Sequence, residues 1–184
     1  MRGLIPASPG ATIWMTGLSG AGKSTIAEAL TKRLESEGRA VEILDGDEVR
    51  TYLSKGLGFS REDRDTNIRR IGFVASLLAR NGVLVISAAI APFADTRAEV
   101  RAMHDRDGTA FLETHIATPV EVCAERDVKG LYAKQAAGEM SGLTGVDDPY
   151  EAPSDPEIVV PTQEQTVEES VETIIGVLRG RGVL

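Results

Sequence analysis

The chain has 184 residues, of which 42% are hydrophobic and 26% charged, as expected for one globular domain spanning residues 1–184 with a sizeable core. The formal net charge of −8 argues against a nucleic-acid partner held by a broad basic face. No apolar run approaches the roughly 20 residues that span a bilayer, so we expect no membrane association. The only cysteine, Cys123, excludes an internal disulfide, favours a reducing cytoplasm, and is expected to be a buried packing residue.

Residues 1–10 contain two prolines and little periodicity, and we expect an irregular lead-in. Ala11–Thr16 then predicts a short buried strand, and residues 24–37 predict a helix with apolar residues at helical spacing. Between them lies the sequence GLSGAGKST, which fits the pattern G-x-x-x-x-G-K-[ST]. A chance match in a glycine-rich loop is the alternative, and the flanking strand and helix count against it.

Each residue type in this motif has a physical role. Glycines allow tight turns and bring backbone N–H groups close to an anion, so the loop and the following helix start form a nest for the α- and β-phosphates of ATP. Lys23 reaches the β- and γ-phosphates, and the Ser24 hydroxyl can bind Mg²⁺. The predicted nucleotide-binding residues are Gly17, Leu18, Ser19, Gly20, Ala21, Gly22, Lys23, Ser24 and Thr25.

The rest of the chain alternates strands and helices. Further strands are predicted over residues 41–44, 83–89, Ala110–Ile116 and Ile158–Val160. Further helices are predicted over residues 47–53, 61–80, Ala94–Asp107, 119–126 and 167–178. Residues 129–153, rich in glycine and proline, predict a long segment with little regular structure, which is usually functional. This order predicts an α/β fold with a parallel sheet, helices on both faces, and ligands beyond the carboxyl ends of the strands.

Two aspartates, Asp45 and Asp47, follow the strand over residues 41–44. If ATP binds the loop, a carboxylate here can face the γ-phosphate, orient an acceptor hydroxyl and take its proton. An Asx-type turn is the alternative, since Asp-Gly is a common turn sequence. For Asp45 both interpretations stay open.

Positive charge is concentrated in a short stretch that holds Arg50, Lys55, Arg61, Arg64, Arg69 and Arg70. On the loop over residues 55–60, Phe59 could stack on a base, and Arg64 could bind a phosphate or sulfate in a bidentate fork. The alternative places Phe59 in the core and makes the arginines a solvated helix face paired with Glu62, Asp63 and Asp65.

Five motifs in one order carry a resemblance over nearly the whole chain: GLSGAGKST, LDGDEVR, LGFSREDRDTNIRR, RDVKGLY and GLTGVDDPYEAP. Together they closely resemble the adenylylsulfate kinases (APS kinases). The resemblance implies a P-loop kinase with a parallel sheet and a mobile lid over about residues 129–153. It implies transfer of the γ-phosphate of MgATP to the 3′-hydroxyl of adenosine 5′-phosphosulfate (APS), giving 3′-phosphoadenosine 5′-phosphosulfate (PAPS) and ADP.

The resemblance also implies residue roles. Asp47 would deprotonate the ribose hydroxyl, Phe59 would stack on the APS adenine, and Arg126 would lie against the ATP adenine. The remaining implied APS-binding residues are Arg50, Arg64, Asn67, Ile90, Ala91, Lys129, Gly142 and Leu143. Many bacterial members carry a serine, described as a phosphate acceptor, where this chain has Ala91, so a phosphoserine there is excluded and direct in-line transfer is expected. Thr66 replaces a glutamate common in the family, with no clear consequence.

Two other functions stay open. One is a related P-loop kinase acting on another nucleotide acceptor, and the other is a non-catalytic module that binds PAPS or ATP. The sequence also leaves open a homodimer and an association with ATP sulfurylase, both suggested by relatives.

Overall fold

The computed structural model describes residues 10–184, and residues 1–9 of the predicted lead-in over residues 1–10 lie outside them. Its centre is a five-stranded sheet in the order β2-β3-β1-β4-β5, with every pairing parallel. The strands are β1 (Ala11–Thr16), β2 (Val41–Asp45), β3 (Leu84–Ala88), β4 (Ala110–Ile116) and β5 (Ile158–Val160). The predicted parallel α/β fold is confirmed.

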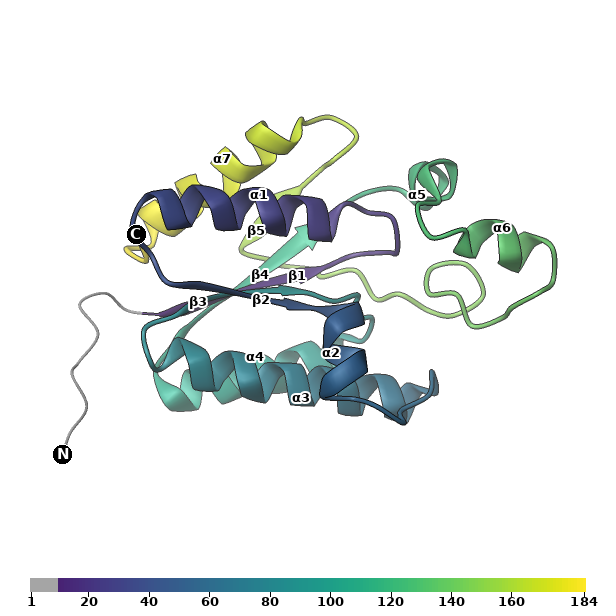
Figure 1. The fold of residues 1–184 in the computed structure, drawn as a ribbon, viewed down its shortest axis with the longest axis horizontal. Coiled ribbons are helices and arrows are strands. Elements are labelled where there is room, and N and C mark those ends of the chain that lie inside the picture. The colour runs from purple at the N-terminus through teal and green to yellow at the C-terminus, as the bar shows by residue number, and fades with distance from the viewer. Residues whose placement is uncertain (1–9) are drawn as a thin grey trace.

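Helices cover both faces of this sheet (Figure 1). They are α1 (Lys23–Ser36), α2 (Gly46–Tyr52), α3 (Arg61–Ala79), α4 (Ala94–Asp107), α5 (Val120–Arg126), α6 (Leu131–Ala136) and α7 (Val167–Gly180). α1 and α7 lie on one face and α3 and α4 on the other, while α5 and α6 lie beyond one end of the sheet. Of the seven helices within residues 10–184, the sequence predicts six, with bounds that differ by at most two residues.

The side chains of β1 pack alternately into two separate hydrophobic cores. Ile13 and Met15, both fully buried, pack on the α1 and α7 side, and Trp14 packs on the α3 and α4 side. Successive residues of a strand point to opposite faces. A strand that is buried on both faces, as every residue of β1 is, needs a helical layer on each side, which fits the position of β1 at the centre of the sheet.

The prediction of little regular structure over residues 129–153 is wrong at α6. Gly130 adopts a left-handed conformation with φ of 66° before the helix begins. The carboxylate of Asp127 accepts hydrogen bonds from the backbone N–H groups of Tyr132 and Ala133, each at 3.0 Å. These bonds satisfy the first orphan donors of the helix, and Tyr132 packs into the core.

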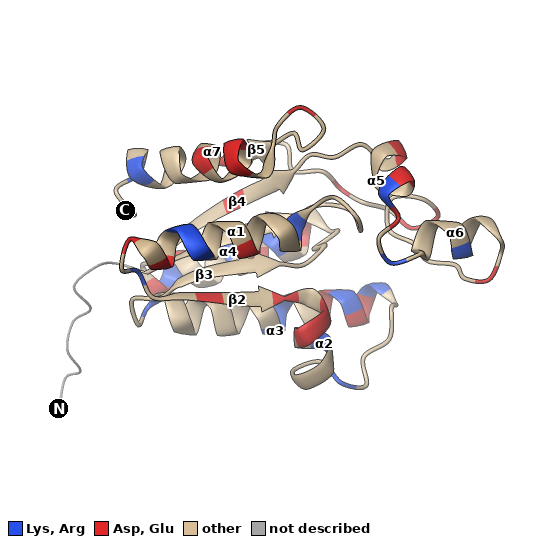
Figure 2. Ribbon diagram, turned by 45° about the horizontal axis from the view of Figure 1, so that its top comes forward, with Lys and Arg blue, Asp and Glu red and all other residues tan. Residues whose placement is uncertain are grey.

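The carboxyl ends of the strands bring distant segments together. The backbone N–H of Gly17, after β1, donates to the carbonyl of Ile90, after β3, at 3.4 Å. The acidic start of α2 stands at the end of β2 (Figure 2). Within residues 10–184, no helix is both long and apolar enough to cross a bilayer.

Candidate active site

A cavity of about 750 Å³ lies at this edge of the sheet. The predicted site residues that line it are Ser19, Gly20, Gly22, Lys23, Ser24, Thr25, Asp47, Arg50, Phe59, Arg64, Asn67, Ile90, Ala91, Arg126 and Lys129. Five predicted residues are not part of its lining: Gly17, Leu18, Ala21, Gly142 and Leu143. The P-loop therefore shares one cavity with Arg50 and Arg64 of the arginine-rich stretch, although these residues lie well apart from it in the sequence.

The phosphate-binding loop depends on its glycines. Gly20 and Gly22 have φ values of 75° and 105°, which side chains with a Cβ atom rarely adopt. A Cβ on Gly20 would also lie 3.1 Å from the carbonyl oxygen of Cys123. Cys123 is fully buried, as predicted, and burial raises the pKa of its thiol, which suits packing rather than nucleophilic chemistry.

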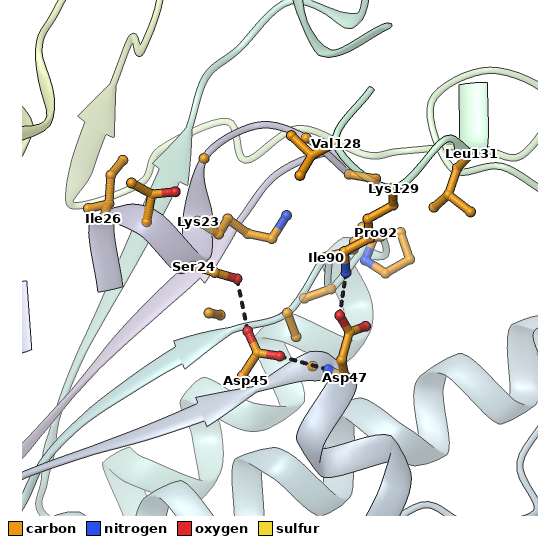
Figure 3. A pocket seen from close by; sticks show the side chains of 18 of the residues that line it. Lys23, Ser24, Ile26, Asp45, Asp47, Ile90, Pro92, Val128, Lys129 and Leu131 are labelled. Atoms are coloured by element: carbon orange, nitrogen blue, oxygen red, sulfur yellow. Dashed lines mark hydrogen bonds and ion pairs between the residues drawn. The ribbon is translucent and has the colours of Figure 1, made fainter. Parts of the chain in front are cut away.

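Lys23 extends from the start of α1 into the cavity (Figure 3). Its ammonium donates to the carbonyl oxygens of Gly17 at 2.8 Å and Leu18 at 2.7 Å. Burial lowers the pKa of Lys23 to about 8, because a desolvated ammonium is less stable than a hydrated one. A phosphate bound in the loop would supply a negatively charged partner for this ammonium, whose present partners are neutral carbonyls.

The structure shows Asp45 in two contacts. Its carboxylate accepts from the backbone N–H of Asp47 at 2.9 Å, so the Asx-type interpretation holds and Asp45 caps α2. Its other oxygen accepts from the Ser24 hydroxyl at 2.9 Å. A hydroxyl beside a carboxylate is the hard oxygen set that Mg²⁺ prefers, with phosphates and waters as its other ligands, so this pair fits a magnesium ion.

Asp47 is 74% exposed as a side chain and forms an ion pair with Lys129 (Figure 3). The two residues come from α2 and from the segment before α6, on opposite sides of the cavity. An exposed carboxylate at the cavity wall is accessible to an acceptor hydroxyl, as general base catalysis requires.

Phe59 stands at the mouth of the cavity and is 69% exposed, so the alternative that placed it in the core is wrong. The guanidinium carbon of Arg50 lies 4.5 Å from the centroid of its ring, a cation–π distance. Asn67 on α3 is 5% exposed, and its Oδ1 has no hydrogen-bond partner among residues 10–184. A buried polar atom without a partner is uncommon in native proteins and suits a ligand donor.

Arg64 differs from both sequence interpretations. It is 8% exposed, so it is no part of a solvated face. Its Nε donates to the carbonyl of Phe59 at 2.8 Å, and Nη1 donates to the Thr144 hydroxyl. Its Nη2 donates to the Gly142 carbonyl and the Asp148 carboxylate, each at 2.7 Å. Four of the five N–H groups of a guanidinium are thus used, and a free bidentate fork is not observed.

Sequence reasoning missed several residues around the P-loop, among them Thr162, which contacts the predicted Arg126, and Tyr132. Arg126 donates to the hydroxyl of Thr162 at 3.1 Å and to its carbonyl at 3.3 Å. Tyr132 of α6 donates to the carbonyl of Ser19 at 2.9 Å. Tyr132 itself is not part of the cavity lining. Unpredicted residues that do line it include Thr162, Ile26, Val128, Leu131, Gln165, Val167 and Ser170. Thr162 follows β5, whose carboxyl end points to the same edge, and this rule could have identified it.

A parallel sheet with a phosphate-binding loop after its first strand, and a cavity that joins this loop to a carboxylate and an aromatic wall, defines a P-loop kinase. Residues 9–161 match the family model described as adenylylsulphate kinase, and the chain belongs to this family.

Similar proteins agree with this assignment. The chain is 58% identical over 177 residues to an adenylyl-sulfate kinase of Rippkaea orientalis, covering 95% of this chain and 94% of that protein. It is 54% identical to an adenylyl-sulfate kinase of Myxococcus xanthus, covering 96% and 95% of the two chains. The structure of the Mycobacterium tuberculosis APS kinase in complex with AMPPNP and APS superposes with a TM-score of 0.90 at 42% identity, covering 94% and 99%.

Proposed function

We propose that this protein transfers the γ-phosphate of ATP to the 3′-hydroxyl of APS, giving PAPS and ADP. The observation that carries the proposal is the single cavity in which the P-loop, Asp47 and Phe59 meet. The similar Mycobacterium tuberculosis kinase was solved with AMPPNP, an ATP analogue, and APS together, which supports a cavity that takes both nucleotides.

On the donor side, the backbone N–H groups of the P-loop hold the phosphates, and Lys23 neutralises the β- and γ-phosphates. Ser24 would bind Mg²⁺ with Asp45 beside it, and the ion, when bound, offsets the charge that develops on the phosphates. Arg126 would lie against the adenine of ATP. Charge neutralisation and alignment matter most here, because phosphoryl transfer passes through a loose transition state.

On the acceptor side, Asp47 takes the proton of the ribose 3′-hydroxyl as the hydroxyl oxygen attacks the γ-phosphorus. Phe59 stacks on the adenine, and Arg50 and Asn67 bind the phosphosulfate and ribose. Arg64 contributes its one remaining N–H and keeps residues 142–148 in place. Lys129 offsets the charge of Asp47 and of the phosphosulfate, and Ile90 and Ala91 complete the pocket. Gly142 and Leu143 lie outside the cavity lining, and the Gly142 carbonyl positions Arg64.

Direct in-line transfer fits this arrangement, since Ala91 has no hydroxyl to receive the phosphate. Residues 129–153 would act as a lid that closes over both nucleotides and excludes water, as other kinase lids do. One domain over residues 1–184, a cytoplasmic location, a homodimer and an association with ATP sulfurylase stay predictions.

An acceptor panel tests the function. We expect ADP release from MgATP in the presence of APS and little release with other nucleotides or with nucleoside diphosphates. Turnover with another acceptor and none with APS would replace this proposal with a related kinase. Nucleotide binding without any turnover would favour the non-catalytic module.

The base assignment predicts the effect of Asp47→Asn. The amide cannot take the proton, so we expect kcat to fall by about 10²–10⁴-fold, while the Kd for ATP changes by no more than about twofold, because the P-loop is unaltered. Stopped-time PAPS formation and calorimetry measure the two quantities. Glu48→Gln is the matched control, since it removes a neighbouring charge of α2 outside the cavity lining. Equal losses of ATP binding and turnover in Asp47→Asn would contradict the assignment.

A further inference from the structure

Arg97, on α4, is a buried cation that the proposed chemistry does not use. Its exposed fraction is 3%. Its Nε donates to Glu113 Oε1 at 2.6 Å, Nη1 to the carbonyl of Ala91 at 2.8 Å, and Nη2 to the carbonyl of Glu151 at 2.7 Å. Glu113 compensates the charge, which an interior otherwise tolerates poorly. The two carbonyls belong to the turn after β3 and to the end of residues 129–153, so one side chain joins two segments of the cavity region.

The turn after β3 adopts a conformation that needs support. Ala91 has a φ of 48°, in the left-handed region that residues with a Cβ rarely adopt. The Thr16 hydroxyl lies 2.6 Å from the carbonyl oxygen of Ile90 and 3.2 Å from that of Ala91. Together with the bond from Arg97, these contacts fix both carbonyls of the turn. Strained backbone persists where its surroundings determine it in this way, most often at functional sites.

The end of residues 129–153 is bonded to the same turn. The N–H of Glu151 donates to the carbonyl of Pro92 at 2.9 Å, and the carboxylate of Glu151 accepts from the N–H of Ala94 at 2.7 Å. The Tyr150 hydroxyl lies 3.0 Å from that of Thr16. Arg97 therefore completes a set of bonds in which the turn and residues 150–151 hold each other.

We propose that Arg97 is a positioning residue that fixes the acceptor-binding turn and the carboxyl-terminal end of the lid as one rigid unit. The proposal rests on the proposed function, which gives the Ile90–Ala91 turn its contact with APS. The P-loop nest and the Lys23 ammonium receive no bond from Arg97. Loosening this unit consequently impairs the acceptor side of the reaction and spares the donor side.

Arg97→Lys tests the proposal. A lysine keeps the positive charge beside Glu113 but its single ammonium lacks the planar fork that reaches three separated acceptors. We expect the KM for APS to rise on the order of tenfold, because small displacements of a positioned substrate are costly, while the KM for ATP stays within about twofold.

Arg101→Lys is the matched control. Arg101 lies one turn further along α4 and forms a bidentate pair with Glu157, with both distances 2.8 Å. It also lies 3.7 Å from Glu113, so it shares the buried charge network, but its partners lie on β4 and just before β5. We expect this variant to lower the melting temperature and to leave the KM for APS unchanged.

A second measurement is independent of activity. Hydrogen exchange of the free protein should be faster in Arg97→Lys at the amide of Glu151, which donates to the carbonyl of Pro92, and unchanged there in Arg101→Lys. If the wild type does not phosphorylate APS, the proposed function fails, and the exchange result still tests whether Arg97 holds the turn and the end of the lid together. An unchanged KM for APS with unchanged exchange in Arg97→Lys overturns the inference, as does an equal change of both in Arg101→Lys.

Discussion

Lys23 shows how burial prepares a single side chain for an anionic ligand. Its ammonium bonds to two P-loop carbonyls, and burial holds its pKa at about 8, below the ordinary 10.5. The nearest ionisable groups oppose each other, since Cys123, Asp45 and Asp47 favour the charged form and Lys129 disfavours it. Burial decides the outcome, so the free ammonium loses its proton at a lower pH than an exposed lysine does.

The lowered pKa of Lys23 predicts that ATP binding takes up a proton in alkaline solution. Above pH 8 the free protein holds Lys23 mostly neutral, and the bound phosphates raise its pKa again. The affinity for ATP should therefore fall as pH rises from 8 towards 10.5, by up to about tenfold per pH unit for one coupled proton. Calorimetry at pH 9 in two buffers of different ionisation enthalpy measures the uptake.

The matched experiments at pH 7 and with Lys23→Ala complete this test. Little proton uptake is expected at pH 7, where the ammonium is already charged. Lys23→Ala should weaken both ATP binding and phosphate transfer and show no uptake at pH 9. A wild type without uptake at pH 9 would refute the argument.

At the scale of elements, the approach of α3 and α4 depends on one glycine. A Cβ on Gly72 would lie 2.5 Å and 2.7 Å from the two γ-carbons of Val100. Gly176 of α7 has no atom within 4 Å of its Cβ position. The two glycines thus separate the intrinsic cost of glycine in a helix from the steric requirement of packing.

Gly72→Ala should lower the free energy of unfolding by about 1–3 kcal/mol, because overpacking outweighs the better helix propensity. Gly176→Ala should raise it by about 0.5–1 kcal/mol, since only propensity changes there. Urea denaturation measures both. Val100→Ala in the Gly72→Ala background should recover part of the loss, and a Gly72→Ala variant as stable as the wild type would disprove the steric argument.

Helix and strand predictions succeed where the apolar pattern is strong, as in the helical spacing of α3 and the continuous apolar run of β3. They fail where a short element depends on distant contacts. α6 has six residues, too few for an apolar stripe, and Asp127 and Tyr132 stabilise it through a cap and a buried ring. Three of the four partners of Arg64 likewise lie 78 to 84 positions away in the sequence. The motif predicted where Arg64 lies, and only the fold shows what it holds.

At the scale of the whole molecule, the site is a product of strand order. β1 lies between β3 and β4, so the P-loop is flanked by the Ile90–Ala91 turn on one side and by the start of α5 on the other. Parallel strands place all these ends at one edge, which the sequence could predict. The bonds that then join the edge, such as those of Arg97, depend on side-chain placement that no local pattern contains.

His104, which joins α4 to β1 by a hydrogen bond to Thr12, also makes the stability of the molecule depend on pH. His104 is fully buried, with Nδ1 2.9 Å from the carbonyl of Val100 and Nε2 2.8 Å from the hydroxyl of Thr12. The carbonyl can only accept, so Nδ1 carries the proton and Nε2 accepts from Thr12. This neutral ring is fully satisfied, and burial lowers the pKa of His104 below its ordinary 6.5.

Protons therefore bind His104 of the unfolded chain first as the pH falls. The free energy of unfolding should decrease from pH 6.5 downwards and stop responding to this group below its folded pKa. Urea denaturation at pH 7.5, 6.5 and 5.5 measures the slope. The pKa of His115 is also lowered by burial, so both histidines contribute to the slope. His104→Gln and His115→Gln should each reduce it in part and the double variant should reduce it further, although His104→Gln is less stable at pH 7.5. An equal slope in His104→Gln and the wild type would show that His104 does not cause the pH dependence of the free energy of unfolding.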